Sequence, residues 1–315
     1  MTQPDPAGRF ASSPAPLPPT QIGPRLFEWG SRTYVMGIVN VTPDSFSGDG
    51  LLATAVGDAG AAGAGVAGAA VARAADALGA AVAQARRMVD EGADILDVGG
   101  ESTRPGHEPV AEGEEAGRVV PVIASIHAAL PDVPISIDSS KPAVVEAALD
   151  AGAALINDVW GVSPDDAMAR LAAERGVPIV LMHNRATAEY QDFVAEFIDD
   201  MRVALARAIV AGVPRQNVIL DPGFGFGKTP SHNLIVIREL ARLRGLGQPV
   251  LLGTSRKSTI GRVLGGLPPE ERLEGTLATT AIGIAAGVDI VRVHDVRANV
   301  RAALVADAVI RGDNL

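Results

Sequence analysis

Four short segments of the sequence combine residue types that could bind a charged small molecule. Segment 97–106 (DVGGESTRPG) places a carboxylate at the end of an apolar run, followed by a glycine pair, hydroxyls and an arginine in a loop. Such a loop suits the binding of an anion or a small molecule. Segments 255–258 (SRKS) and 292–296 (RVHDV) supply cations, and segment 221–228 (DPGFGFGK) places an acid beside a glycine-rich turn.

The two basic segments are typical of anion sites. SRKS follows an apolar run and precedes a short segment of helical spacing, and the free N–H groups at a helix start attract carboxylates and phosphates. In RVHDV, Arg292 and His294 alternate along a strand and therefore point the same way. This pair, at the end of the last strand, predicts a phosphate site.

The glycine-rich segment 221–228 fits neither common nucleotide-binding loop. A Walker A loop needs a glycine five residues before Gly227, where this chain has Pro222, and the alternating glycines do not match the dinucleotide pattern. We interpret the segment as a tight turn that lets the backbone approach a flat ligand. Phe224 and Phe226 are then candidates for stacking or wall residues.

Composition limits the chemistry that is available. The chain has 315 residues and no cysteine, which excludes disulfides, thiolate nucleophiles and cysteine-ligated zinc, so any metal must use O or N ligands. The net charge of -10 argues against broad nucleic-acid binding, and an anionic substrate would need a local basic cluster. No run is apolar enough for a membrane helix and the first residues do not read as a secretion signal, so we predict a cytoplasmic protein.

Short β-rich runs alternate with segments of helical spacing along most of the chain. Eight such runs cover residues 33–41, 94–98, 134–138, 154–158, 178–182, 217–221, 249–254 and 289–294. Helical spacing is found at residues 74–91, 142–151, 193–211, 233–243 and 274–286. Strict alternation predicts a parallel sheet, and eight units in this length favour a closed (β/α)8 TIM barrel over an open sheet.

Each of the eight runs ends in polar side chains. They are Asn40, Asp97, Asp138, Asn157, His183, Asp221, residues 255–257, and Arg292 with His294. The C-terminal ends of all strands of a barrel converge on one face, where active sites are found. We therefore expect these side chains to gather in a single site.

Two segments differ from the barrel pattern. Residues 1–24 are rich in Pro, Ala, Ser and Thr and are predicted to form a disordered tail, which leaves residues 25–315 as one barrel domain. Residues 51–73 are almost wholly Ala, Gly and Val and follow the first strand. They are either a low-complexity insertion that avoids the site or a lid element.

Seven motifs, in this order, resemble those of the bacterial dihydropteroate synthase family of pterin-binding proteins. They are MGIVNVTPDSFS (36–47), DVGGESTRPG, ISIDSSKP (135–142), LINDVWG (155–161), DPGFGFGK, GTSRKS (253–258) and RVHDV. The resemblance implies a (β/α)8 barrel, usually a homodimer, that uses Mg2+. It also implies a transferase of folate biosynthesis that condenses 6-hydroxymethyl-7,8-dihydropterin diphosphate with p-aminobenzoate and releases pyrophosphate. The insertion at 51–73 makes the first loop longer than is usual in the family.

The residue types at the strand ends suit a pterin. Its edge carries amino and ring N–H donors beside carbonyl and ring-nitrogen acceptors, so a selective pocket needs carboxylates, an amide and a cation. Asp138, Asn157, Asp221 and Lys257 supply that set, and by similarity they bind the pterin.

The resemblance assigns further residues to the diphosphate group of the first substrate and to the second substrate, p-aminobenzoate. The diphosphate would be held by Arg104, Arg292, His294 and a magnesium ion bound through Asn40. The p-aminobenzoate site would be formed by Thr103, Arg104, Pro105, Phe226 and Ser258. The groups expected to act in catalysis are Arg104, Lys257, Arg292 and His294.

The expected mechanism is dissociative: the diphosphate leaves first, the dihydropterin ring shares the positive charge, and the arylamine attacks. Two alternatives remain open. A methyltetrahydrofolate-binding corrinoid methyltransferase domain shares the barrel and the pterin-binding Asp and Asn positions, but would not need STRPG, SRKS or RVHDV. A catalytically silent pterin-binding paralogue would be expected to lose its diphosphate ligands, which are present here.

Overall fold

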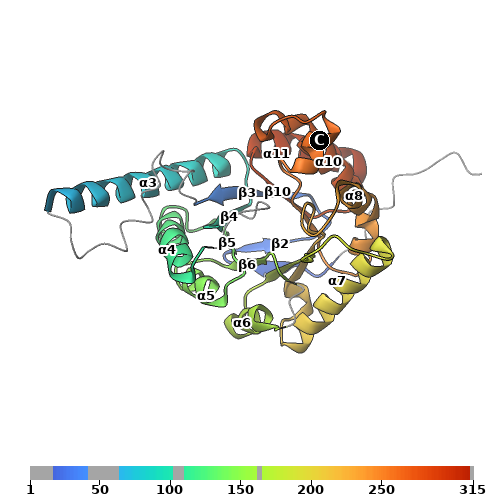
Figure 1. The fold of residues 1–315 in the computed structure, drawn as a ribbon, viewed down its shortest axis with the longest axis horizontal. Helices are drawn as coiled ribbons and strands as arrows, with labels where there is room; N and C mark the ends of the chain where they lie inside the picture. Colours follow the sequence, from blue (N-terminus) through green and yellow to red (C-terminus); the bar gives the residue numbers. More distant parts are fainter. Residues whose placement is uncertain (1–16, 42–63, 102–109, 162–164, 313–315) are drawn as a thin grey trace, which may run out of the picture.

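Eight parallel strands form the centre of the molecule in a computed structural model (Figure 1). The structure describes residues 17–41, 64–101, 110–161 and 165–312, with side chains from residue 76 onward in the second range. The strands follow the order β8-β7-β6-β5-β4-β3-β10-β9. A parallel bridge between Leu220 and Val250 joins the two ends of this order. The sheet therefore closes into the predicted (β/α)8 barrel.

The eight predicted runs are all strands. The barrel strands are β3 (Tyr34–Asn40), β4 (Ile95–Gly99), β5 (Ile135–Asp138), β6 (Leu155–Asp158), β7 (Ile179–Met182), β8 (Val218–Asp221), β9 (Leu251–Leu252) and β10 (Ile290–Val293). The helices around them are α3 (Ala64–Asp90), α4 (Glu112–Ala129), α5 (Pro142–Asp150), α6 (Ala167–Arg175), α7 (Phe193–Val210), α8 (Pro230–Arg244), α9 (Ser258–Val263), α10 (Leu273–Ala285) and α11 (Val296–Arg311). Two 3-10 turns, Arg215–Asn217 and Pro269–Glu271, precede β8 and α10.

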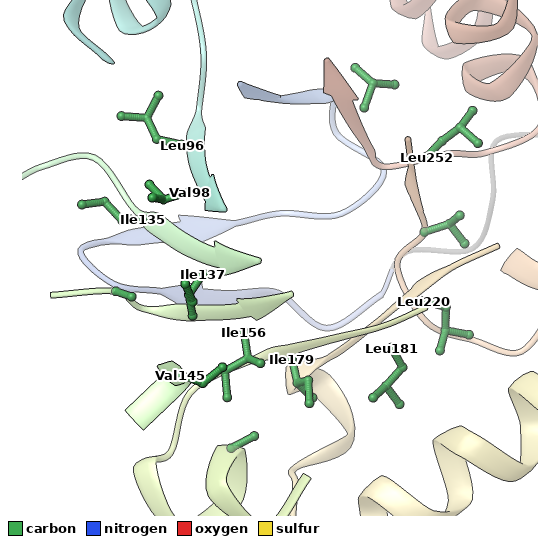
Figure 2. Packing of buried hydrophobic residues seen from close by; sticks show 14 of the residues in the cluster. Leu96, Val98, Ile135, Ile137, Val145, Ile156, Ile179, Leu181, Leu220 and Leu252 are labelled. Carbon is green, nitrogen blue, oxygen red and sulfur yellow. The ribbon is translucent and has the colours of Figure 1, made fainter. Parts of the chain in front are cut away.

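Along each barrel strand, side chains alternate between the inside of the barrel and the surrounding helices. Outward residues such as Leu96, Val98 and Ile156 join one large apolar cluster with the helices (Figure 2). Inward residues such as Ile95, Leu155 and Ile290 form a second cluster inside the barrel. Because the side-chain period of a strand is two, this alternation decides which residues at the end of each strand point into the barrel.

A short hairpin lies against the N-terminal end of the barrel. It comprises β1 (Thr20–Ile22) and β2 (Arg25–Phe27), which pair antiparallel. Ile22 and Phe27 are buried in the inner cluster, and the Phe27 and Tyr34 rings lie 4.7 Å apart. The predicted tail boundary at residue 24 is therefore wrong, because apolar side chains after the proline-rich stretch find a surface to bury. Residues 1–16 lie outside the described part of the chain.

Helix α3 begins earlier than predicted. Helical spacing predicted a start at residue 74, whereas α3 starts at Ala64 and so includes the last ten residues of segment 51–73. Alanine has the highest helix propensity, which offsets the glycines of this stretch. The remainder of the segment, residues 51–63, lies outside the described residues, so the choice between insertion and lid stays open.

Across the described ranges, none of the helices combines the length and the apolar character that crossing a bilayer requires.

Candidate active site

The inward-facing polar residues gather at the C-terminal mouth of the barrel. Asn40, Asp138, Asn157 and Asp221 are the last or next-to-last residues of their strands, and Asp138 lies opposite Asn157 in the strand register. Gly99 is the register neighbour of Asp138 on the other side, and a β-carbon at Gly99 would lie 3.4 Å from the Asp138 side chain. The missing side chain leaves space beside the Asp138 carboxylate.

Arg292 lies at the centre of this mouth. Its Nε donates to Asp97 Oδ2 at 2.6 Å and one terminal nitrogen donates to Asp138 Oδ2 at 2.5 Å. Burial alone would lower the pKa of Arg292, but the two carboxylates outweigh burial and raise it. Burial raises the pKa of Asp138, and Arg292 opposes that rise. The guanidinium thus compensates two acids that have little contact with water.

Asp97 is a site residue that sequence reasoning left out of its binding set. Asp97 is fully buried, two residues before the C-terminal end of β4. Its carboxylate accepts hydrogen bonds from Asn157 Nδ2, at 3.2 Å, and from Arg292. It therefore orients both groups. Its place at the end of an apolar run was visible in the sequence, but its partners were not, because they come from strands far apart in the chain.

Asp221 begins the glycine-rich turn that closes one side of the mouth. Its Oδ1 accepts from the Gly223 backbone N–H at 2.7 Å. Gly223 has a φ of 65°, and a β-carbon there would lie 1.9 Å from the His183 carbonyl oxygen. Burial raises the pKa of Asp221 to about 6, and the Gly223 N–H and Lys257 oppose the rise. The turn thus requires glycine and presents a strongly desolvated carboxylate.

Lys257 and Phe226 face each other beside Asp221. The Lys257 ammonium lies 4.0 Å from the centre of the Phe226 ring, within cation–π range. Burial and the charge of Arg292 lower the pKa of Lys257 to about 8, so the side chain is a cation at neutral pH. Phe224, the other predicted wall residue, is instead buried in the outer cluster. Only Phe226 of the two reaches the mouth.

The start of α9 is held by a strained residue. Arg256 has a φ of 57° and makes two hydrogen bonds to Asp295, at 3.0 and 2.6 Å. Lys257 caps α9, which has only six residues, and Ser258 is exposed at its first position. The predicted short helix after SRKS is therefore present. Lys257 stands at its N-terminus, and six residues make only a short helix dipole.

His294 extends the polar surface past the end of β10. Its Nδ1 lies 3.0 Å from Ser255 Oγ, which also accepts from the His294 backbone N–H at 3.1 Å. Burial, together with Arg292 and Arg256, lowers the pKa of His294 to about 4. The imidazole is therefore neutral at pH 7 without ligand. It offers a hydrogen-bond donor, whereas the sequence suggested a positive charge.

His183 does not belong to the mouth, although it follows the fifth predicted run. The ring is fully buried on the outer side of the barrel, 5.1 Å from the Phe197 ring of α7 in a T-shaped contact. Its Nε2 lies 3.0 Å from Asp200 Oδ2, also on α7. Strand β7 ends one residue earlier, at Met182, so the alternation turns His183 outward.

Three predicted site residues, Thr103, Arg104 and Pro105, lie outside the described residues. Of the others, Asn40, Asp138, Asn157, Asp221, Phe226, Lys257, Arg292 and His294 are on strand ends or on the loops directly after them. The described groups combine buried acids, two amides and two cations. Such a set can hold the donor–acceptor edge of a flat heterocycle and neutralise a leaving anion.

Comparisons with known proteins agree with this chemistry. The profile of the pterin binding enzyme family matches residues 66–294. The dihydropteroate synthase of Clostridium beijerinckii is 48% identical to this chain over 92% of the chain and 99% of the relative. That of Bacillus subtilis is also 48% identical, over 91% of this chain and 92% of its own length.

Solved structures of dihydropteroate synthases are similar throughout the barrel. One from Clostridium difficile, determined in the presence of pteroic acid, has a TM-score of 0.80 and 47% identity, and the match covers 90% of this chain and 99% of that one. One from Xanthomonas albilineans, in complex with 7,8-dihydropteroate, has a TM-score of 0.77 and 39% identity, with 93% and 98% covered.

Proposed function

The chain belongs to the pterin-binding enzyme family and, within it, to the dihydropteroate synthases, and from this we propose how its residues perform the reaction. The enzyme condenses 6-hydroxymethyl-7,8-dihydropterin diphosphate with p-aminobenzoate to 7,8-dihydropteroate and pyrophosphate, a step of folate biosynthesis. The observation that carries this proposal is the joining of Asp97, Asp138 and Asn157 with Arg292 at the barrel mouth.

The pterin is bound by the residues of the inner mouth. The Asp138 and Asp221 carboxylates accept from its amino and ring N–H groups, and Asn157 and Lys257 provide donors for its ring nitrogens and carbonyl. The register of β5 and β6 places Asp138 and Asn157 opposite each other, as two contacts on one heterocycle edge require. All four side chains are wholly or partly buried, so a mismatched heterocycle would leave unpaired polar groups.

The diphosphate is neutralised at the outer mouth by Arg292 and by Arg104, which is outside the described residues, and the neutral imidazole of His294 donates a hydrogen bond to it. A magnesium ion fits this arrangement. Mg2+ prefers oxygen ligands and commonly uses one or two protein groups plus substrate phosphates, and Asn40 offers a half-buried amide oxygen at the end of β3. Within the described ranges, no cluster of three His, Asp or Glu side chains offers a complete protein cage. The ion would add positive charge on the leaving group.

The reaction is dissociative. The bond between the pterin methylene carbon and the diphosphate oxygen breaks first, and the bond electrons leave with pyrophosphate. The dihydropterin ring shares the positive charge, and the amine nitrogen of p-aminobenzoate then attacks the methylene and loses a proton. Catalysis consists of electrostatic stabilisation of the leaving group by Arg292 and orientation of the amine. Phe226 and Ser258, with Thr103 to Pro105 from the undescribed loop, form the second-substrate site.

The experiment that tests this function is a two-substrate assay. We expect pyrophosphate and dihydropteroate to form together, in equal amounts, and only when both substrates are present. We also expect p-aminobenzoate to bind weakly to the empty protein and at least about tenfold more tightly with pyrophosphate and Mg2+, because Arg104 is assigned to both the diphosphate and the p-aminobenzoate site and the first ligand would fix its position. Methyl transfer without pyrophosphate release would indicate the corrinoid alternative. Pterin binding without product would indicate the silent paralogue.

We also propose that the chain forms a homodimer through α10 and α11. These helices lie side by side (Figure 1) and expose Ile282, Leu304, Val305 and Val309 by between 53 and 67%. Apolar side chains gathered on neighbouring helices are typical of an interface between subunits. A cytoplasmic location stays a prediction from the sequence.

The dimer proposal can be tested with one charged substitution. Val305→Glu is expected to give a monomer in light scattering coupled to size exclusion, because a carboxylate would be desolvated in the interface. Val210→Glu on α7 is the control, since Val210 is even more exposed, at 88%, but stands on another side of the barrel. A wild-type monomer, or an unchanged dimer in Val305→Glu, would contradict this interface.

A further inference from the structure

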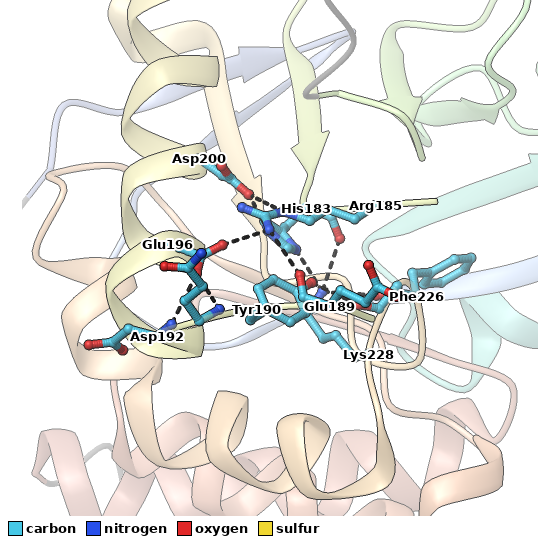
Figure 3. A network of polar contacts seen from close by, with 11 residues as sticks. His183, Arg185, Glu189, Tyr190, Asp192, Glu196, Asp200, Phe226 and Lys228 are labelled. Atoms are coloured by element: carbon cyan, nitrogen blue, oxygen red, sulfur yellow. Dashed lines mark hydrogen bonds and ion pairs between the residues drawn. The ribbon is translucent and has the colours of Figure 1, made fainter. Parts of the chain in front are cut away.

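Lys228 ends the glycine-rich turn, and its ammonium is enclosed by hydrogen-bond acceptors (Figure 3). Nζ lies 2.7 Å from His183 Nδ1, and 3.0, 3.0 and 3.2 Å from the carbonyl oxygens of Gly223, Phe226 and His183. The carbonyls of Gly223 and Phe226 belong to the turn itself. The other two acceptors belong to His183, the residue directly after β7. The ammonium therefore joins the turn to the barrel wall.

A second layer of contacts fixes the orientation of the His183 imidazole, which Lys228 contacts. His183 Nε2 lies 3.0 Å from Asp200 Oδ2, which also accepts from Arg185 Nε at 2.8 Å. Burial lowers the pKa of His183 to about 4, so its ring is neutral. With Nε2 donating to Asp200, Nδ1 is left as the acceptor for Lys228. The contacts run from α7 through His183 to the turn that carries Asp221 and Phe226.

The choice of lysine at this position is informative. The chain has 27 basic residues of the lysine and arginine types, and 24 of them are arginine. The three lysines are Lys141, Lys228 and Lys257. All three lysines stand shortly after the ends of barrel strands. A compact ammonium with three donors fits a cage of carbonyls that a planar guanidinium would not, and its pKa responds to burial far more readily.

We propose that Lys228 is a positioning residue that sets the glycine turn, and through it the carboxylate of Asp221 and the ring of Phe226, for both substrates. Lys228 itself touches neither reacting group. The Gly223 N–H bonded to Asp221 and the Gly223 carbonyl bonded to Lys228 belong to the same residue, so release of one displaces the other. The inference rests on the proposed function, because it takes Asp221 as a pterin ligand and Phe226 as part of the second-substrate site.

The arrangement makes substrate affinity depend on pH. Burial lowers the pKa of Lys228 to about 7, while Asp221 and Asp200 raise it, and Arg185 and Lys257 lower it further. The protonated side chain has three donors for four acceptors, whereas the neutral amine has two. As pH rises through about 7 the turn loses a hydrogen bond, and pterin affinity is expected to fall. Protonated Lys228 at low pH supports binding.

The test compares pterin affinity by calorimetry in wild type, Lys228→Met and the control Arg202→Met between pH 6 and 9. Arg202 is on α7 near Asp200 but pairs with Asp199 at the exposed surface. At pH 6 we expect Lys228→Met to weaken pterin binding by about tenfold to a hundredfold, from loss of buried hydrogen bonds. The KM of both substrates should rise while kcat stays within about threefold of wild type.

The pH profile separates positioning from general destabilisation. The ratio of Lys228→Met to wild-type dissociation constants should shrink as pH rises through about 7, since wild type then loses the same proton. Effects of Lys257, whose pKa is lowered to about 8, are common to both proteins and cancel in the ratio. A ratio that stays constant across this range, or an unchanged affinity at pH 6, would overturn the proposal.

Asp200→Asn keeps the proposal testable if Lys228→Met does not fold. Asp200 raises the pKa of Lys228, so its neutral replacement should move the alkaline midpoint of pterin affinity to lower pH. An unmoved midpoint would overturn the inference. Failure of wild type to form dihydropteroate would instead count against the proposed function, so the two failures are distinct.

Discussion

Arg292→Met is expected to lower the free energy of unfolding by about 3–5 kcal/mol at pH 7, because it leaves buried acids without their cation. Asp97 is fully buried and Asp138 nearly so, and Arg292 bonds both. Turnover should fall by at least about a hundredfold, since the same group stabilises the leaving diphosphate. Pterin affinity should fall too, because Arg292 orients Asp138.

The measurement is urea unfolding at several pH values, with Arg297→Met as the control. Arg297 is on α11, the helix that follows the strand of Arg292, but it is largely exposed and lies 3.6 Å from Glu91. In Arg292→Met the uncompensated Asp138 carboxyl takes up a proton on folding, because burial raises its pKa and Arg292 no longer opposes that rise. The stability deficit should therefore be small near pH 4 and widen as pH rises. A deficit no larger than that of Arg297→Met would contradict this account of the mouth.

Asp221→Asn is expected to separate binding from stability. Pterin affinity should fall by about a hundredfold, on the order of 3 kcal/mol, because an amide nitrogen faces pterin donors where a carboxylate oxygen should accept. Stability should rise, since burial places the pKa of Asp221 at about 6 against 3.8 for the ordinary group. The Gly223 N–H can still donate to the amide oxygen.

The sign of the pH effect follows from that raised pKa. The folded protein binds the Asp221 proton more tightly than the unfolded chain, so this group stabilises the fold below pH 4 and loses that contribution as pH rises through about 6. Asp221→Asn and wild type should therefore be equally stable near pH 4 and differ by about 3 kcal/mol above pH 7. Urea unfolding at pH 4, 6 and 8 measures the difference.

Asp158→Asn provides a matched control for this experiment. Asp158 also ends a barrel strand, is buried, accepts a backbone N–H from Trp160 at 2.9 Å, and has a pKa raised by burial to about 6. By the alternation along β6 it points outward, whereas its neighbour Asn157 points into the barrel. It should reproduce the change in stability and leave pterin affinity intact. Equal affinity losses in both variants would remove Asp221 from the pocket.

Much of this molecule follows from sequence periodicity. Eight apolar runs separated by helical segments specify a parallel barrel, because each strand must bury both faces and each crossover needs a helix. Polar residues at the run ends then converge on one face, and period-two spacing in RVHDV correctly predicts that Arg292 and His294 share a side. The glycines of 221–228 predict a tight turn, and at Gly223 the turn has no room for a side chain because a β-carbon there would lie 1.9 Å from the His183 carbonyl oxygen.

Tertiary structure decided which side chains meet and which way ambiguous ones face. The run 178–182 is apolar at every position, so it carries no alternation from which to read the outward direction of His183. Phe224 and Phe226 lie two positions apart in a glycine turn, where strand alternation does not apply, so their spacing did not show that Phe224 would be buried. The pairing of Arg292 with Asp97, the hairpin that buries Ile22, and the enclosure of Lys228 join residues up to 195 positions apart. Such contacts depend on barrel closure and strand register, which place distant residues together and which local spacing does not encode.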